Sequence, residues 1–206
     1  MWIDEKFLKI KEFTSLDSKK YKSVIDLGAR NQILKKFIPT NWEYTGVDKF
    51  TLEKNLNIDV ERNFDLIKDK YDLVIALDII EHLNDPINFF NNCSKISKKT
   101  IILNIPNVAY YQFRFNFLLR GTLTEKFHFS GNNENDRHRW FTTFENIQDF
   151  LKNINSKDYK CNIIKIYKSR NKLKFLNIFE KYLGNLFPNL FCWSILLIFD
   201  KNEKNI

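Results

Sequence analysis

Two aspartates lie at or next to the end of short apolar runs, where a carboxylate could bind a nucleotide-like ligand. Asp26 precedes Gly28, and an Asp-x-Gly turn that leads into a helix lets the backbone approach a ligand closely. Asp48 ends the next apolar run, 22 residues later, where a carboxylate can accept both ribose hydroxyls of an adenosyl cofactor. Asp59 and Val60 could then receive the adenine amino group and cover the ring. The competing interpretations are a structural turn at Asp26 and an Asx turn at Asp59.

A third acidic residue and a histidine follow the apolar run 71–77. Asp78 closes this run, which would point it into a crevice shared by cofactor and substrate. His82 lies four residues further on and could be the general base that takes a proton from an attacking hydroxyl. A capping or packing role for His82, just before Asp85 and Pro86, is the alternative interpretation.

A concentrated polar cluster and an aromatic stretch are candidates for substrate binding. The run Arg137, His138 and Arg139 would suit a phosphate or carboxylate, because arginine offers a bidentate fork. A solvated surface is the alternative for this run. Tyr110 and the aromatic residues after it could wall a substrate pocket, although such a stripe is also typical of a core or a dimer surface.

Alternating strand and helix patterns must position these residues. Strands are predicted at 23–27, 44–47, 71–77 and 100–105, with helical spacing between them at 32–38 and 87–96. Asp85 and Pro86 supply an N-cap and a first-turn proline for the second of these helices. This alternation of strands and helices predicts an α/β fold with a parallel sheet, and ligands at the carboxyl ends of its strands.

The pattern changes after Pro106. It predicts a helix within 108–120, a long polar loop at 121–136 that could act as a lid, and a helix capped by Thr142 or Thr143, with Glu145 as the capping-box partner of Thr142. Late strands at 161–167 and 192–199 flank a helical insert at 173–186, which favours an antiparallel edge. We expect one domain over 1–206, with helical insertions at about 108–140 and 172–188.

Composition limits the classes of function. The chain has 206 residues, 44% of them hydrophobic, which excludes a mainly disordered protein. Its net charge of +8 is spread along the chain, so a solvated lysine-rich surface is favoured over a nucleic-acid groove. The three cysteines show no CxxC spacing, so neither a disulfide framework nor a metal site is expected, and a cytoplasmic location is favoured. No export signal and no transmembrane span are expected.

The motifs together resemble a known enzyme family. The Asp-x-Gly turn, the acid-ended second strand and the Glu81-His82-Leu83 segment after the strand at 71–77 look like a class I S-adenosylmethionine (SAM)-dependent methyltransferase. Pro106-Asn107, a Leu-Leu-Arg-Gly block at 118–121, His-Arg-Trp-Phe-Thr at 138–142 and Pro-Asn-Leu at 188–190 resemble the MetW-like branch. The resemblance covers about residues 22–200. It implies a Rossmann-like doubly wound sheet, mostly parallel with an antiparallel edge strand.

The resemblance also implies the composition of the site. SAM would be the cofactor and S-adenosylhomocysteine (SAH) the product. The residues expected at the cofactor are Asp26, Gly28, Ala29, Arg30, Asp48, Lys49, Asp59, Val60, Leu77 and Asp78. His82 and Asp78 are the expected catalytic residues, and Tyr110, Arg137, His138 and Arg139 are expected to bind the substrate.

The first loop departs from the family pattern of Gly-x-Gly-x-Gly. Only Gly28 remains, and Arg30 and Gln32 stand where the next two glycines would fall. Missing glycines cost the loop its freedom at positive φ. Two interpretations stay open: the loop is reshaped and Arg30 helps to hold the cofactor carboxylate, or SAM binding is weakened or lost.

We therefore predict a methyltransferase that transfers a methyl group from SAM to oxygen or nitrogen of a small molecule. The Arg-His-Arg cluster favours an anionic acceptor such as a sugar, a sugar phosphate or a surface-polysaccharide precursor. The alternative is a catalytically degenerate MetW-like protein that binds and regulates another enzyme. A homodimer or a partner enzyme is compatible with either, and nucleic-acid methylation would have only the net charge in its favour.

Overall fold

A single mixed sheet organises the protein. The computed structural model describes residues 4–16, 19–50, 55–123, 125–127, 137–168 and 174–202. Within these ranges, seven strands form one sheet in the order β3-β2-β1-β4-β5-β7-β6. The bounds of the strands are Ser23–Leu27 (β1), Glu43–Asp48 (β2), Leu56–Asn57 (β3), Tyr71–Leu77 (β4), Ser97–Pro106 (β5), Tyr159–Ile166 (β6) and Ser194–Lys201 (β7).

The direction of the strands agrees with the expected fold class. Strands β1 to β5 pair in parallel, whereas β7 pairs antiparallel with both β5 and β6. The mostly parallel α/β sheet with antiparallel pairing at one side is therefore confirmed. The antiparallel strand is β7, which enters between β5 and β6.

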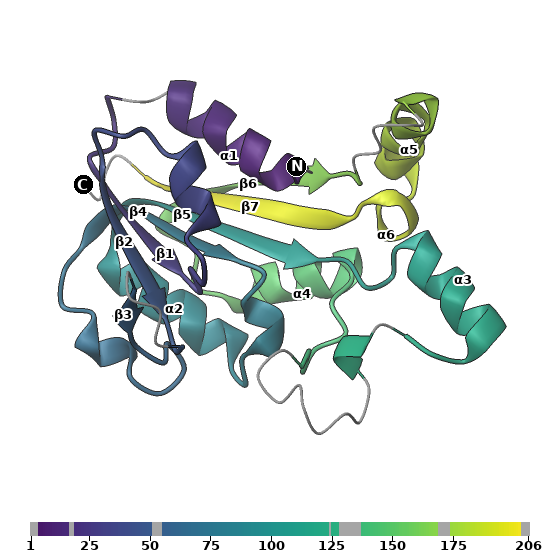
Figure 1. Ribbon diagram of the computed structural model, residues 1–206, viewed down its shortest axis with the longest axis horizontal. Helices are drawn as coiled ribbons and strands as arrows, with labels where there is room; N and C mark the ends of the chain where they lie inside the picture. Colours follow the sequence, from purple (N-terminus) through teal and green to yellow (C-terminus); the bar gives the residue numbers. More distant parts are fainter. Residues whose placement is uncertain are drawn as a thin grey trace.

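Helices cover both faces of the sheet (Figure 1), with α1 on one side and α2 and α4 on the other. The α-helices are α1 (Glu5–Leu16), α2 (Pro86–Ile96), α3 (Tyr111–Arg120), α4 (Phe144–Asn153), α5 (Lys174–Leu186) and α6 (Pro188–Phe191). Short 3₁₀ turns are η1 (Ile33–Phe37), η2 (Phe64–Leu66), η3 (Ile80–His82) and η4 (Glu125–Phe127). None of the helices in the described part of the chain is long and apolar enough to cross a lipid bilayer.

The two faces of the sheet carry separate cores, because neighbouring residues of a strand point to opposite sides. In β4, Val74 packs with Phe89 and Phe90 of α2, whereas Leu73 and Ile75 pack on the side of α1. All three strand residues are fully buried. The near-continuous apolar sequence of this strand, which made it easy to predict, follows from this burial on both faces.

Helix capping agrees with the sequence in one case and corrects it in another. Asp85 caps α2, and its Oδ1 accepts a hydrogen bond of 2.9 Å from the backbone N–H of Asn88. The expected capping box of Thr142 and Glu145 is wrong. Thr143 caps α4 by accepting from the N–H of Asn146, and the hydroxyl of Thr142 donates to the Pro106 carbonyl at 2.7 Å.

Other local predictions hold only in part. The stretch 32–38 forms one short 3₁₀ turn, and helix α1 was not predicted. Most of the expected lid at 121–136 lies outside the described residues. Helices α3 and α5 fall in the two stretches expected as insertions, and their status as insertions into a single domain stays a prediction.

Asn107 joins the end of β5 to the chain before β7. Its side chain is fully buried, and its Nδ2 donates to the carbonyls of Cys192 at 2.7 Å and Asn189 at 3.0 Å. Its Oδ1 accepts from the N–H of Ala109 at 3.0 Å. One amide thus satisfies buried backbone groups of two distant segments.

We expect Asn107→Ala to lower the free energy of unfolding by about 2–4 kcal/mol, because it leaves buried carbonyl and N–H groups without partners. Urea denaturation followed by circular dichroism measures this change. The control is Asn153→Ala at the exposed end of α4, which should cost less than about 0.5 kcal/mol. Equal effects of the two substitutions would contradict the bridging role of Asn107.

Candidate functional site

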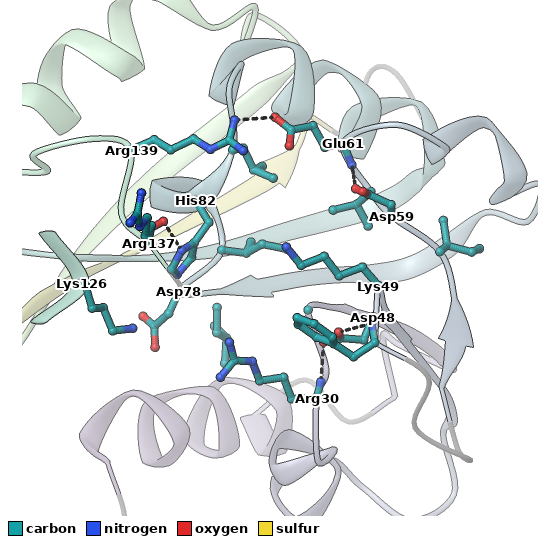
Figure 2. Close-up of a pocket in the computed structure, with 17 residues that line it drawn as sticks. Arg30, Asp48, Lys49, Asp59, Glu61, Asp78, His82, Lys126, Arg137 and Arg139 are labelled. Atoms are coloured by element: carbon teal, nitrogen blue, oxygen red, sulfur yellow. Dashed lines mark hydrogen bonds and ion pairs between the residues drawn. The ribbon is translucent and has the colours of Figure 1, made fainter. Parts of the chain in front are cut away.

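A cavity of about 290 Å³ lies at the carboxyl ends of β1, β2 and β4. Strands β2 and β4 lie on opposite sides of β1, so this edge of the sheet is the switch point where open α/β sheets bind ligands. Figure 2 shows side chains from these strand ends and from the segment 137–139 facing one another across the cavity. It is lined by Gly28, Arg30, Asp48, Lys49, Phe50, Ile58, Asp59, Val60, Glu61, Leu77, Asp78, Ile79, His82, Leu83, Lys126, Arg137 and Arg139.

The loop after β1 keeps a glycine-like backbone although two glycines are missing. Gly28, Arg30 and Gln32 have φ angles of 81°, 39° and 52°. These are the three positions at which the family pattern places glycine. Left-handed backbone costs a residue with a Cβ roughly 1–2 kcal/mol, so neighbouring contacts must hold this loop in shape. At Gly28 a Cβ would also lie 3.0 Å from Ile79 Cδ1.

Hydrogen bonds around Asn55 and Asp48 hold the loop. The N–H of Arg30 donates to Asp48 Oδ2 at 2.9 Å, and the Arg30 carbonyl accepts from Asn55 Nδ2 at 2.7 Å. Gln32 Nε2 donates to Asn55 Oδ1 at 2.8 Å. Gly46 leaves room for this pair, because a Cβ there would overlap Asn55.

Asp48 is buried at the bottom of the cavity. Its Oδ1 accepts a second backbone hydrogen bond, of 3.0 Å, from Phe50. Each carboxylate oxygen can accept more than one hydrogen bond, so Asp48 keeps acceptor capacity toward the cavity. Asp59, across the cavity, forms the Asx turn that its sequence suggested, since its Oδ1 accepts from the N–H of Glu61 at 2.9 Å.

Asp26 lies beneath the loop and is not part of the cavity wall. Its Oδ2 accepts a hydrogen bond of 2.5 Å from the hydroxyl of Tyr44. Burial raises the pKa of Asp26 to about 7, the Tyr44 hydrogen bond lowers it, and the nearby charge of Asp48 raises it further. A bound cation near Asp26 would favour its ionised form.

Asp78 is held by residues from two other parts of the chain. It adopts a φ of 52°, and its Oδ1 accepts from Asn104 Nδ2 at 2.5 Å. Its Oδ2 pairs with the ammonium group of Lys6 on α1. Burial lowers the pKa of Lys6, but the charges of Asp78 and Asp4 outweigh this, so the pKa is raised. Lys6 and Asp78 thus form an ion pair at the cavity.

His82 lines the cavity next to a buried acid. Its Nδ1 lies 2.8 Å from the carbonyl oxygen of Arg137, and since a carbonyl only accepts, Nδ1 carries the proton. Glu81 is 1% exposed, and its Oε1 lies 3.9 Å from Nε2 of both His82 and His138. Burial and the charge of Asp78 raise the pKa of Glu81 to about 8, opposed by a backbone hydrogen bond at Glu81 and by the charges of Lys126 and Lys6.

The segment 137–140 is docked on the turn η3. The N–H of Arg139 donates to the Glu81 carbonyl at 2.8 Å, and Trp140 Nε1 donates to the Leu83 carbonyl at 2.7 Å. The Arg139 side chain lies 3.7 Å from Glu61 (Figure 2). This docking brings the arginines of the cluster to the cavity, where Lys126 adds a further cation.

The structure gathers most of the residues expected from the sequence. Those on the cavity wall are Gly28, Arg30, Asp48, Lys49, Asp59, Val60, Leu77, Asp78, His82, Arg137 and Arg139. Ala29 is buried behind the loop, and its N–H donates to the Val47 carbonyl. His138 lies behind His82, with ring centroids 4.9 Å apart. Tyr110, predicted to bind the substrate, does not line the cavity. It is fully buried, and its hydroxyl donates to Glu180 at 2.9 Å, so it has a packing role.

Sequence reasoning missed six residues of the wall: Phe50, Ile58, Glu61, Ile79, Leu83 and Lys126. Ile79 and Leu83 lie within two residues of the Glu81-His82 pair, which was predicted from the sequence. Their closeness to this pair could have marked them as wall residues. Lys126 carried no such signal, because its place depends on how the chain after α3 returns to the sheet.

Known structures share this fold. The plantazolicin methyltransferase BpumL with bound SAH is 15% identical, with a TM-score of 0.61 over 95% of this chain and 82% of that chain. A SAM-dependent methyltransferase from Archaeoglobus fulgidus is 19% identical, with a TM-score of 0.53 over 95% and 94% of the two chains. The magnesium protoporphyrin IX methyltransferase ChlM from Synechocystis PCC 6803 is 12% identical, with a TM-score of 0.59 over 96% and 83%. A search of curated proteins finds no significant match.

A sequence model described as methyltransferase domain matches residues 2–158, which is most of the chain. The MetW-like branch stays a prediction, because neither the family match nor the shared fold separates it from other branches. The resemblance to class I SAM-dependent methyltransferases is confirmed, and the chain belongs to the methyltransferase domain family.

Proposed function

We propose that the cavity binds SAM and that the protein transfers its methyl group to oxygen or nitrogen of a small anionic acceptor, leaving SAH. The observation that carries this proposal is the buried carboxylate of Asp48 beside a loop with left-handed backbone at positions 28, 30 and 32. A loop that keeps this shape without its glycines supports the reshaped-loop interpretation. It argues against a protein that has lost the cofactor and acts only as a partner.

The cavity offers suitable groups for the adenosyl part of SAM. Asp48 would accept the ribose hydroxyls, and the apolar side chains of Ile58 and Leu83 would face the adenine ring. Asp59 would receive the adenine amino group. Arg30 would hold the methionyl carboxylate, and Asp26 beneath the loop would favour the ammonium group, directly or through water.

The charges around the cavity support an anionic acceptor. Arg137, Arg139 and Lys126 come from one side, next to the catalytic candidates Asp78 and His82 (Figure 2). The solved relatives act on chemically different molecules, since their names include plantazolicin and magnesium protoporphyrin IX. Charge is therefore the better guide, and sugar phosphates or surface-polysaccharide precursors fit it. A cytoplasmic location and a homodimer or partner enzyme stay predictions.

The reaction needs alignment and the removal of one proton. The acceptor's lone pair forms a bond to the methyl carbon while the carbon–sulfur bond breaks and its electrons stay on sulfur. His82 would assist the loss of the acceptor's proton. The hydrogen bond from its Nδ1–H to the Arg137 carbonyl supports this role, because it leaves Nε2 as the basic nitrogen.

Calorimetric titration with SAM and SAH tests the cofactor assignment. We expect a micromolar Kd for SAM, about 8 kcal/mol of binding free energy. Asp48→Asn should weaken binding at least tenfold, because it loses the ionised acceptor for the ribose and for two backbone N–H groups. Asp149→Asn on the exposed face of α4 is the matched control and should leave the Kd unchanged. Absence of binding to the wild type would favour the regulatory-partner function.

Substitutions of Arg30 separate backbone strain from side-chain contacts. Arg30→Gly should raise the free energy of unfolding by about 1 kcal/mol, because glycine adopts positive φ without strain. Arg30→Ala keeps the strain and should show no such gain. Both should weaken SAM binding several-fold through loss of the guanidinium. Thermal denaturation and calorimetry measure the two effects, and unchanged affinity in both variants would remove Arg30 from the carboxylate site.

His82→Gln tests the role of His82 in the transfer step. We expect SAM affinity to change less than twofold and the rate of methyl transfer to fall by roughly 10²–10⁴, the usual contribution of general acid–base catalysis. The rate is measured as tritium passed from methyl-labelled SAM into a panel of phosphorylated sugars and other anionic acceptors. A wild-type rate on the accepted substrate would exclude this role.

A further inference from the structure

A buried acid and two imidazoles meet at the edge of the cavity. Oxygen and nitrogen ligand atoms of Glu81, His82 and His138 all lie within 4.8 Å of one another. Glu81 and His82 come from the turn η3, and His138 comes from the segment docked on it. Two adjacent residues and a third that lies more than 50 positions later in the chain thus form one cluster of potential metal ligands.

The carboxylate of Glu81 is the member of the cluster that most needs a partner. Its Oε2 is buried and has no hydrogen-bond partner among the described residues. Its Oε1 lies 3.9 Å from each imidazole Nε2, which is too far for a hydrogen bond. A buried carboxylate oxygen without a partner is costly, and buried carboxylates in proteins are paired or bind metals.

The hydrogen bonding of His82 leaves one ring nitrogen suited to bind a metal ion. Because its Nδ1–H donates to the Arg137 carbonyl, the neutral ring presents the lone pair of Nε2, the atom nearest to Glu81. A hydrogen bond from the other ring nitrogen to a carbonyl is the usual support of a metal-binding histidine. The ring of His138 stands nearly perpendicular to that of His82, at 87°.

We propose that Glu81, His82 and His138 bind one divalent first-row transition-metal ion of the zinc or manganese type. Two imidazoles and one carboxylate are a donor set for such ions, and three protein ligands leave a position open for another molecule. Tetrahedral ligands about 2.1 Å from an ion lie about 3.4 Å apart. The two carboxylate–imidazole distances of 3.9 Å would therefore shorten by roughly half an ångström on binding, and any wider separation within the 4.8 Å limit would shorten by more.

The place of the cluster suggests what the ion would do, and this step rests on the proposed function. His82 belongs to the cavity wall, so the open position would face the acceptor. An ion there would lower the pKa of an acceptor hydroxyl. The proton would pass to water, and the oxygen would then form its bond to the methyl carbon as the carbon–sulfur bond breaks. The acceptor atom is accordingly a hydroxyl oxygen, and His82 would act as a ligand in place of a free base.

This site was not expected from the sequence. The expectation of no metal rested on the absence of paired cysteines, whereas these ligands are imidazoles and a carboxylate. The glutamate and the first histidine are adjacent in the chain, but the second histidine reaches them only through the docking of 137–140 on η3.

Metal binding is tested on protein purified without a histidine tag and stripped with a chelator. We expect Co²⁺ to produce visible absorption bands that saturate at one ion per chain, and Zn²⁺ and Mn²⁺ to compete for the site. Glu81→Gln and His138→Gln should each lower the affinity for Co²⁺ at least tenfold. Glu145→Gln, on the exposed surface of α4, is the matched control and should bind as the wild type does.

Two results would overturn the site: no saturable binding of Co²⁺, Zn²⁺ or Mn²⁺ to the wild type, or unchanged binding in both ligand variants. Two variants are used so that the loss of fold in one leaves the other informative. SAM is titrated separately in the presence of chelator. Binding of SAM without binding of metal would remove this inference alone, and binding of metal without binding of SAM would remove the proposed function alone.

Discussion

The carboxylate of Asp48 is the contact on which the cavity depends. It lies at the end of β2, buried, and accepts backbone hydrogen bonds from Arg30 in one loop and Phe50 in the next. Charge-assisted hydrogen bonds of this kind are about twice as strong as neutral ones. Two loops that would otherwise be independent are thereby fixed to one strand end, at the switch point of the sheet.

The loop after β1 shows how a backbone shape survives the loss of the residues that usually permit it. Glycine makes the left-handed conformation inexpensive, whereas here hydrogen bonds supply the compensation. Asn55 connects the Arg30 carbonyl to the Gln32 side chain, and Gly46 provides the space for that pair. In exchange, the loop gains a guanidinium at the cavity that a glycine could not provide.

The other half of the site is built by docking one irregular segment on another. The residues 137–140 form hydrogen bonds with Glu81 and His82 of the turn η3 and with Leu83, which follows it. This contact places cationic side chains on the cavity wall and an imidazole beside a buried acid. Under the proposed function, cofactor binding and acceptor chemistry would fall to different parts of the chain that share one cavity wall, at Asp78 and His82.

The sequence alone determined the central strands and the acids that end them, because burial on both faces produces apolar runs and polar residues mark their ends. Strands β1 and β4 match the prediction residue for residue, and Asp48 and Asp78 lie at the cavity as expected. The tertiary structure decided what depends on contacts between distant residues. Lys6 pairs with Asp78 across 72 positions, and His138 meets Glu81 only after docking. No local pattern encodes such contacts, since they arise when separate elements pack and buried polar groups must find partners.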